Sequence, residues 1–329
     1  MSFEKNDYIG SVLFFKHLIL GIVAILILVP TVIAIREGVS LSSARAELTN
    51  LNAVIGGTAS DLSNTEIPQK EAPADALSAP EILSGAKVVA HGMGTADNVP
   101  MLNCLESFAE SYEKGIRVFE ADLRMTSDGH VILRHDWRAE LQDGISETSI
   151  PTLAEFLAKP INGQYTPLSF RDLLALMEQY PDICIITDTK FVNEEEVTRQ
   201  FRAMLRDAYE TGLTYLFDRM VIQVYTPMMF RVVDSLYSFP HYIFTLYYTG
   251  FACTQSDFRE KAEFCKENGI MGITLWDYWW SEDYTPIAQE NGICVYAHTV
   301  NDAEWAQRLL SSGISAVYSD SLCPSDLVR

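Results

Sequence analysis

Short apolar runs alternate with amphipathic stretches from residue 86 to the end of the chain. The apolar runs predict strands, at Lys87–Ala90, Val118–Leu123, Val131–Arg134, Ile183–Thr189, Met220–Val224, Tyr242–Tyr247, Gly272–Leu275, Ile293–Ala297 and Ala316–Tyr318. The amphipathic stretches predict helices, at Asn103–Lys114, Ser169–Gln179, Glu194–Tyr209, Pro227–Tyr237, Ser256–Glu267 and Asp302–Ser311. Because repeated strand–helix units build parallel sheets covered by helices, the pattern predicts an α/β fold, a (β/α)8 barrel over 86–329. An open doubly wound sheet is the alternative, but no GxGxxG turn follows the first strand.

The strand at Val131–Arg134 is one more than an eight-stranded barrel requires. It follows its predecessor across a tight turn at residues 126–129, and tight turns join antiparallel strands. We therefore expect this pair to rise past the barrel mouth and fold back, which brings His135 close to Glu120. Residues 138–167 have no clear periodicity and are predicted to form an insertion over the mouth.

The N-terminal part of the chain has a different composition. Leu18–Ile35 is an uncharged apolar run long enough to cross a bilayer, so residues 1–37 are predicted to be a membrane anchor with a transmembrane helix at about 12–35. A cleaved signal peptide is the alternative, although its apolar region is normally shorter. Lysines before the run favour a cytoplasmic N-terminus, which predicts a single-pass protein of the cell membrane with the barrel outside. Residues 38–85, rich in Ser, Ala, Thr, Asn, Glu and Pro, are predicted to be a flexible spacer.

The charge balance narrows the possible partners. The 329-residue chain carries a formal net charge of -20. Nucleic-acid backbones require Lys and Arg, so this balance argues against a nucleic-acid partner. An acidic chain is compatible with divalent cations, although a solvated acidic surface explains the composition equally well. No CxxC pair is present, which excludes zinc-ribbon and thioredoxin-type sites, while a disulfide between Cys253 and Cys265 stays open.

Two predicted strands carry acidic residues on one face. Glu120 and Asp122 alternate with apolar residues along 118–123, so both acids are expected to point into the barrel. Two buried like charges are costly unless a positive charge lies between them, which favours a bound cation or an ion pair with Lys or Arg. Asp188 ends a second strand, where barrel enzymes place their chemistry, and Lys190 on the same face suits a phosphate oxygen. A local Asp–Lys pair is the alternative for these two.

Further candidates stand at the ends of other strands. His91 ends the first strand and His135 ends the return strand, and imidazoles titrate near neutral pH, so the pair suits general acid–base catalysis. A lone histidine is more often structural, but two histidines beside three converging carboxylates favour catalysis. Polar or aromatic side chains that we expect to contact a substrate at the mouth are Gln223, Tyr225, Trp276 and His298.

These residues form a series of motifs along the chain. In order they are His91-Gly-Met-Gly94, Asn103, Glu120-Ala-Asp122, Thr126-Ser-Asp-Gly129, His135-Asp136, Asp188-Thr-Lys190, His298-Thr-Val-Asn301 and Ser319-Asp320. With them, residues 86–329 resemble the glycerophosphodiester phosphodiesterase family, whose TIM barrel is shared with bacterial phosphatidylinositol-specific phospholipase C. The family pattern reads His-Arg-Gly, Asn, Glu-x-Asp, Thr-x-Asp-Gly, His-Asp, Glu-x-Lys, Trp-Thr-Val-Asn and Thr-Asp.

The resemblance implies an enzyme that hydrolyses a glycerophosphodiester to an alcohol and glycerol phosphate. Its implied substrates are phospholipid head groups, lysophospholipids or wall glycerol phosphates. The implied site holds one Ca²⁺ or Mg²⁺ ion through the carboxylates of Glu120, Asp122 and Asp188. His91 and His135 would be its acid–base pair, and Lys190 would contact the phosphate. Two alternatives remain: a phospholipase C-like lyase that releases a cyclic phosphate, and an inactive barrel that only binds a ligand.

Three positions depart from the family pattern. The arginine that normally follows the first histidine is replaced by Gly92, which removes one phosphate contact. The acid before the helix-opening Asn103 is replaced by Leu102, which removes one usual cation ligand. The third carboxylate is Asp188 instead of the longer glutamate, so we expect a cation site of altered geometry. Asn103, with Glu106 three residues later, also resembles a helix-capping box.

Overall fold

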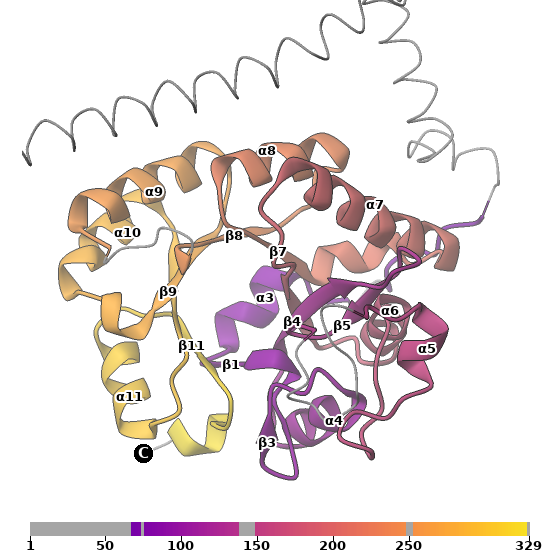
Figure 1. Ribbon diagram of the computed structural model, residues 1–329. Coiled ribbons are helices and arrows are strands. Elements are labelled where there is room, and N and C mark those ends of the chain that lie inside the picture. The colour runs from indigo at the N-terminus through magenta and orange to yellow at the C-terminus, as the bar shows by residue number, and fades with distance from the viewer. Residues whose placement is uncertain (1–66, 74–75, 138–148, 248–252, 328–329) are drawn as a thin grey trace, which may run out of the picture. The chain divides into compact units, whose positions relative to one another are not determined.

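The computed structural model describes residues 67–73, 76–137, 149–247 and 253–327, and within them eight parallel strands close into a barrel (Figure 1). The strands are β1 (Val88–Ala90), β4 (Val118–Met125), β6 (Cys184–Asp188), β7 (Met220–Val224), β8 (Tyr242–Thr245), β9 (Gly272–Trp276), β10 (Cys294–His298) and β11 (Ala316–Ser319). The pairing order is β1-β11-β10-β9-β8-β7-β6-β4, and a pairing of Ala90 with Phe119 between β1 and β4 completes the ring. The predicted (β/α)8 barrel is confirmed.

The ninth predicted strand, β5 (Val131–Leu133), is the expected antiparallel return strand. It pairs with the outer end of β4, with Leu123 opposite Leu133. Gly129 closes the turn at φ +80°, a conformation that glycine adopts without steric cost. A short hairpin that the sequence pattern does not predict, β2 (Thr95–Ala96) with β3 (Val99–Pro100), follows β1.

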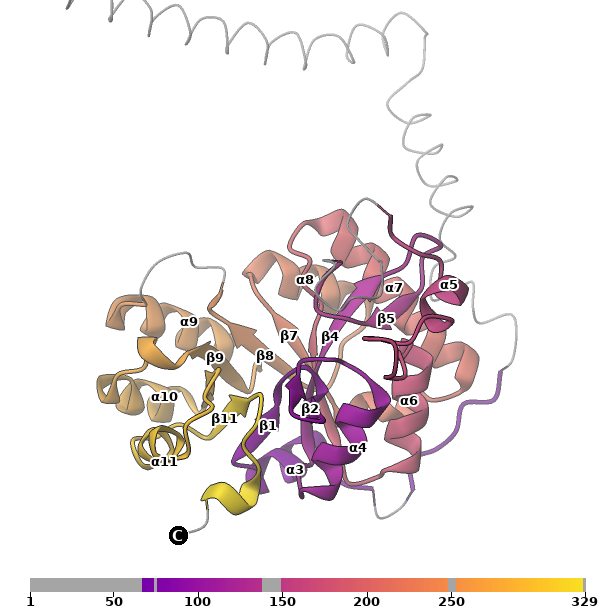
Figure 2. The same cartoon turned by 60° about the horizontal axis from the view of Figure 1, so that its bottom comes forward.

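Helices surround the barrel, and α6, α7 and α8 lie against one another on its outside (Figures 1 and 2). The six predicted helices are present as α4 (Leu105–Glu113), α6 (Phe170–Gln179), α7 (Glu194–Thr211), α8 (Pro227–Leu236), α9 (Gln255–Glu267) and α11 (Ala303–Ser311). Three more α-helices and five 3-10 turns are present in the described residues: α3 (Ala79–Gly85), α5 (Leu153–Leu157), α10 (Thr285–Asn291), η2 (His91–Met93), η4 (Thr214–Arg219), η6 (Asp277–Trp279), η7 (Glu282–Tyr284) and η8 (Pro324–Leu327).

Local sequence sets several helix ends. Ser169 and Asp172 form a reciprocal capping box at the start of α6, which satisfies backbone N–H groups that have no partner within the helix. The expected capping box of Asn103 with Glu106 is wrong: Cys104 caps α4, and Ser107 is its partner. Asn103 instead lies in the left-handed region at φ 51° with its side chain turned toward the barrel.

The strands divide the core into two layers. On β4, Phe119, Ala121 and Leu123 pack outward with the surrounding helices. Val118 points inward with Cys184 and other small or branched side chains, which fill the barrel below the mouth. The alternation predicted for this strand is therefore confirmed, and the acidic residues share the inward face with Val118.

Part of the segment predicted as spacer (38–85) is folded. Helix α3 lies across the barrel end opposite the mouth, where Ala79, Ile82 and Leu83 pack with the inner layer (Figure 1). The Lys70 N–H also donates to the carbonyl of Gly212 at 2.9 Å. Small residues, a proline and a glycine dominate 76–85, so the composition of this segment conceals the helix. The rest of the predicted spacer before residue 67 lies outside the described residues.

Two other sequence expectations concern the membrane and the cysteines. In the described part of the chain, no helix combines the length and apolarity that a bilayer crossing requires. The predicted transmembrane helix at 12–35 lies outside that part. Cys253 and Cys265, whose pairing the sequence leaves open, are both free thiols. Burial raises the pKa of Cys265 to about 12, so this thiol stays protonated at neutral pH.

Candidate active site

A cavity of about 440 Å³ opens at the carboxyl ends of the barrel strands. Nine of the ten predicted site residues line it: His91, Glu120, His135, Asp188, Lys190, Gln223, Tyr225, Trp276 and His298. The tenth, Asp122, is completely buried beside it. The register explains this convergence, because Asp122 lies opposite Asp188 in the parallel pairing of β4 with β6.

The three predicted carboxylates form one buried cluster. Ligand oxygens of Glu120, Asp122 and Asp188 all lie within 4.8 Å of one another. Burial, together with the charge of Asp122, raises the pKa of Glu120 to about 8. Burial also acts to raise the pKa of Asp122, but the charges of Lys190 and the two histidines outweigh it and hold that pKa below its ordinary value. The cluster therefore holds negative charge at a cost that a cation would lower.

The donor set fits a hard divalent cation. Oδ1 of Asp188 is buried and has no hydrogen-bond partner, so an acceptor within the cluster is left unsatisfied. Carboxylate oxygens are the ligands that Ca²⁺ and Mg²⁺ prefer. Lys190 lies in the same cluster, with Nζ 2.7 Å from Oδ1 of Asp122 and in contact with Asp188. Leu102 contributes no ligand, because it packs in a small apolar cluster with Tyr165.

One backbone group and one side-chain amide hold the acids in place. The Gly92 N–H donates to Oε2 of Glu120 at 2.6 Å. Gly92 has φ +54°, and a Cβ there would lie 2.7 Å from the Cα of Met101, so this loop has no room for a side chain. The amide of Asn103 binds Asp122 twice, donating to Oδ2 at 2.7 Å and accepting from the backbone N–H at 3.0 Å. The helix-opening asparagine is therefore a positioning residue for Asp122.

His91 is oriented by a carboxylate from the end of the barrel sequence. Its Nδ1 lies 2.7 Å from Oδ1 of Asp320, and Asp320 in turn accepts from Asn301 at 2.7 Å. Burial acts to lower the pKa of His91, but the Asp320 hydrogen bond and the charges of Glu120 and Asp122 raise it to about 9. His91 is therefore protonated at neutral pH and suited to donate a proton.

His135 approaches the cavity from the return strand. Its Nδ1 lies 3.0 Å from Oδ2 of Asp136, and its side chain is 44 % exposed. The Arg134 N–H donates to the carbonyl of Asp122 at 2.9 Å, so the hairpin fixes the height of His135 above the cluster. The expectation that the hairpin returns His135 to the mouth beside Glu120 is confirmed, because both line the same cavity.

Part of the cavity wall is aromatic. The ring of His298 lies 4.4 Å from Trp276 and 4.3 Å from Tyr247. Burial, followed by the charges of His91 and Lys190, holds the pKa of His298 well below its ordinary value, so this imidazole is neutral. These neutral rings lie directly beside the candidate acid–base residue His91, whose ring centre is 5.2 Å from that of His298.

Sequence reasoning missed several residues of the site. Arg124, Tyr247, Thr299 and Tyr318 line the cavity, and Asp320 holds His91. Arg124 has a signal in the sequence, because it continues the inward alternation of Glu120 and Asp122 along β4. Asp320 belongs to the Ser319-Asp320 motif, but no local signal pairs it with His91, which is 229 positions away.

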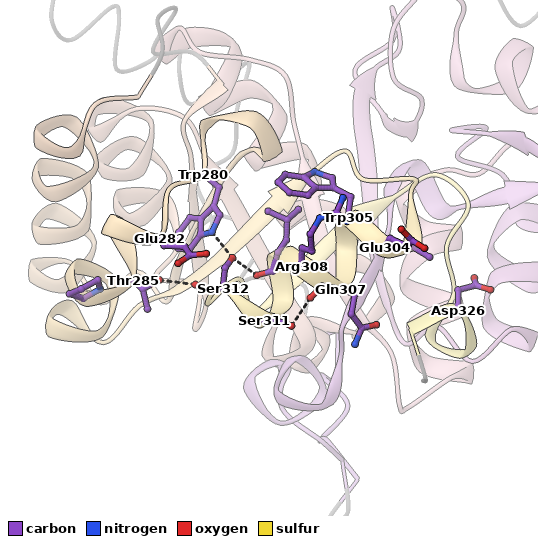
Figure 3. Close-up of a pocket in the computed structure, with 13 residues that line it drawn as sticks. Trp280, Glu282, Thr285, Glu304, Trp305, Gln307, Arg308, Ser311, Ser312 and Asp326 are labelled. Carbon is purple, nitrogen blue, oxygen red and sulfur yellow. Dashed lines mark hydrogen bonds between the residues drawn. The ribbon is translucent and has the colours of Figure 1, made fainter.

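A larger cavity, of about 990 Å³, lies outside the barrel between α10 and α11 (Figure 3). None of the ten predicted residues lines it. Its polar groups bond with one another: Trp280 donates from Nε1 to Oγ of Ser312 at 2.8 Å, and Thr285 donates to the Ser312 carbonyl at 2.9 Å (Figure 3). Size alone favours this groove, but the carboxylate cluster and the candidate histidines line the cavity at the mouth.

Comparison with known proteins agrees with the geometry of the mouth. The model of the glycerophosphoryl diester phosphodiesterase family matches residues 93–322. A structure described as a putative glycerophosphoryl diester phosphodiesterase from Silicibacter pomeroyi is 18% identical with a TM-score of 0.61, covering 75% of this chain and 94% of that chain. A phosphodiesterase from Oleispira antarctica, in complex with the product sn-glycerol-3-phosphate, is 19% identical with a TM-score of 0.60, covering 73% and 94%. At these identities the structural likeness establishes the fold.

Proposed function

Because this chain belongs to the glycerophosphoryl diester phosphodiesterase family, it is a phosphoric diester hydrolase, and we propose that its barrel mouth hydrolyses glycerophosphodiesters with one divalent cation. The observation that carries the proposal is the buried cluster of Glu120, Asp122 and Asp188 beside the Asp320-held His91. The Oleispira antarctica protein with its bound product supports a glycerol phosphate product for the fold. Phospholipid head groups, lysophospholipids and wall glycerol phosphates are the proposed substrates.

The proton transfers follow from the two imidazoles. A water or a substrate hydroxyl attacks phosphorus and gives its proton to His135, which faces the cavity from the hairpin. The bond from phosphorus to the leaving alcohol breaks, and His91 donates its proton to the departing oxygen. Asp320 stabilises the protonated state of His91 before that step. Lys190, which already lies among the carboxylates, neutralises charge on a phosphate oxygen.

The cation would be held by the three carboxylates and would supply positive charge to the phosphate oxygens. Asn103 keeps Asp122 turned toward this position, and the Gly92 N–H does the same for Glu120. The aromatic wall with Trp276 excludes water from one side of the reacting phosphate. Gln223 and Tyr225 lie at the end of β7, at the same mouth, and complete the proposed substrate contacts.

The first experiment measures hydrolysis of glycerophosphocholine and glycerophosphoethanolamine by the full-length chain in EDTA, Mg²⁺ or Ca²⁺. We expect cation-dependent release of alcohol. His91→Ala and His135→Ala are each expected to lower kcat by about 10²- to 10⁴-fold, the usual contribution of an acid or base. His241→Gln is the matched control, since His241 does not line the cavity.

The outcomes separate the alternatives. Turnover that EDTA leaves unchanged would contradict the role of the cation, and no turnover of any glycerophosphodiester would leave the inactive binding barrel as the explanation. Phosphorus NMR of the products distinguishes the remaining case, because a lyase accumulates a cyclic phosphate before any ring opening.

We also propose that the chain is held at the cell membrane with the barrel on its outer side. The uncharged run Leu18–Ile35 and the lysines before it support this arrangement. Full-length protein is expected in the membrane fraction, extracted by detergent and retained in carbonate. Release by carbonate would contradict a spanning anchor.

A further inference from the structure

Gly92 creates a deficit of positive charge at the mouth. Its φ is +54° and a Cβ at this position would lie 2.7 Å from the Cα of Met101, so there is no space for any side chain. Lys190 pairs with Asp122 and Asp188, and His91 pairs with Asp320, so both of these cations already face carboxylates. Beside Lys190 and the cation, a donor nearer to solvent would therefore add positive charge to the anionic oxygens of a phosphodiester that enters the cavity.

Arg124 is positioned to provide that donor. It lies two residues beyond Asp122 on the inward face of β4, so its side chain lines the cavity nearer to solvent than the carboxylates. Its Nε donates to the carbonyl of His135 at 2.9 Å, and the guanidinium carbon lies 5.9 Å from the centre of the Phe191 ring. These contacts hold the guanidinium plane while using one of its five N–H groups.

Within the part of the chain that the structure describes, no group accepts a hydrogen bond from the terminal nitrogens of Arg124. Among the described residues, no carboxylate forms an ion pair with Arg124, although Glu120 and Asp188 line the same cavity. Guanidinium groups bind phosphate oxygens through two parallel N–H donors, which makes arginine the usual residue for such contacts. From this geometry we infer that Arg124 binds a non-bridging oxygen of the scissile phosphodiester, on the solvent side of the carboxylate cluster. This inference rests on the proposed function.

The test compares Arg124→Ala and Arg124→Lys with wild type in the full-length chain. For Arg124→Ala we expect kcat/KM for glycerophosphocholine to fall about 10- to 100-fold, the usual effect of losing a charge-assisted hydrogen bond. Added guanidinium ion is expected to restore part of the activity of Arg124→Ala, whereas a purely structural role through His135 would give no such rescue. Arg124→Lys should recover only part of the loss, because a point charge lacks the paired donors.

Arg206→Ala is the matched control. Arg206 also contacts the β4–β5 hairpin, through the carbonyl of Gly129 at 3.3 Å, but it does not line the cavity. This variant is expected to keep kcat/KM close to wild type. Thermal melts of each variant verify folding.

A binding measurement keeps the inference testable without turnover. Calorimetry with glycerol 3-phosphate and Ca²⁺ is expected to give an affinity about 10- to 100-fold lower for Arg124→Ala than for wild type. Equal affinities, or a loss that guanidinium ion does not reverse in the activity assay, would overturn the role of Arg124. Absence of hydrolysis by wild type with phosphate binding still dependent on Arg124 would instead count against the proposed function alone.

Discussion

Replacing Glu120 by glutamine is expected to stabilise the cation-free protein while it abolishes catalysis. Glu120 is 2 % exposed, shares the barrel interior with two other carboxylates, and accepts the Gly92 N–H. Glutamine has the same shape and can accept the same hydrogen bond through its side-chain oxygen. It carries no charge, so the substitution removes one member of a buried cluster of like charges.

The magnitude follows from the pKa of Glu120, which burial and the charge of Asp122 raise from 4.5 to about 8. A carboxyl whose pKa is higher in the folded than in the unfolded state destabilises the protein as pH rises above the unfolded-state pKa. This loss of stability stops growing once pH exceeds the folded-state pKa. At pH 7, the interval above 4.5 multiplied by about 1.4 kcal/mol per pH unit gives a cost of about 3–4 kcal/mol. This is an upper bound, because the same substitution weakens the charge that supports protonated His91.

Thermal melts in EDTA measure the effect. For a domain of this size, about 3–4 kcal/mol corresponds to a rise in Tm of about 6–16 °C at pH 7. Near pH 4.5 the two proteins should melt together. Addition of Ca²⁺ or Mg²⁺ at about 100 times its Kd is expected to stabilise wild type by about 2.7 kcal/mol and the variant hardly at all.

Asp207→Asn is the matched control for a buried acid that has a partner. Asp207 is 2 % exposed and lies 3.0 Å from Arg171. Replacing it by asparagine removes this ion pair and should lower the stability of the protein by about 1 kcal/mol. A Glu120→Gln protein that melts below wild type at pH 8 in EDTA would refute the reasoning. So would a difference in Tm that stays constant between pH 4.5 and pH 8.

Three further predictions test the supports of the site. Asp320→Asn, which loses the carboxylate at 2.7 Å from His91, is expected to lower kcat by about 10²-fold with little change in KM, and an unchanged kcat would contradict a positioning role. Gly92→Ala is expected to cost about 1–3 kcal/mol in urea unfolding, because its Cβ meets Met101, whereas Gly85→Ala has open space and no positive φ and should cost less. Asn103→Ala, which frees Asp122, should weaken Ca²⁺ binding by about 10- to 100-fold in calorimetry, and an unchanged affinity would contradict its role.

The barrel can be predicted from sequence because each strand carries its own signal. Apolar alternation along β4 is a local consequence of one face meeting the helices and the other meeting the barrel interior. The tight turn before β5 likewise identifies the return strand. Helix α3 gives no comparable signal, because its seven residues include a proline and a glycine and are too few to show a helical period. Only the fold shows Ile82 and Leu83 packed under the barrel.

Some residues of the candidate site can likewise be predicted from local sequence, whereas others can be placed only by the fold. The acids, Lys190 and the histidines stand at predicted strand ends, so the alternation of side chains along the strands is enough to bring them together. Local sequence assigns Asn103 to a helix cap, and only the folded chain places it against Asp122. The Asp320 contact depends on barrel closure, and it cannot be found from the order of residues alone.

The return strand has a consequence for how this enzyme can change over evolutionary time. One unbroken hydrogen-bonded ladder runs from β1 through β4 to β5, with Ala90 opposite Phe119 and Leu123 opposite Leu133. The spacing between His91 and His135 is therefore set by strand register and does not depend on the lengths of the connecting segments. Insertions and deletions in those segments can accumulate as near-neutral drift, which opens the rim to new substrates while the distance between the two imidazoles is preserved.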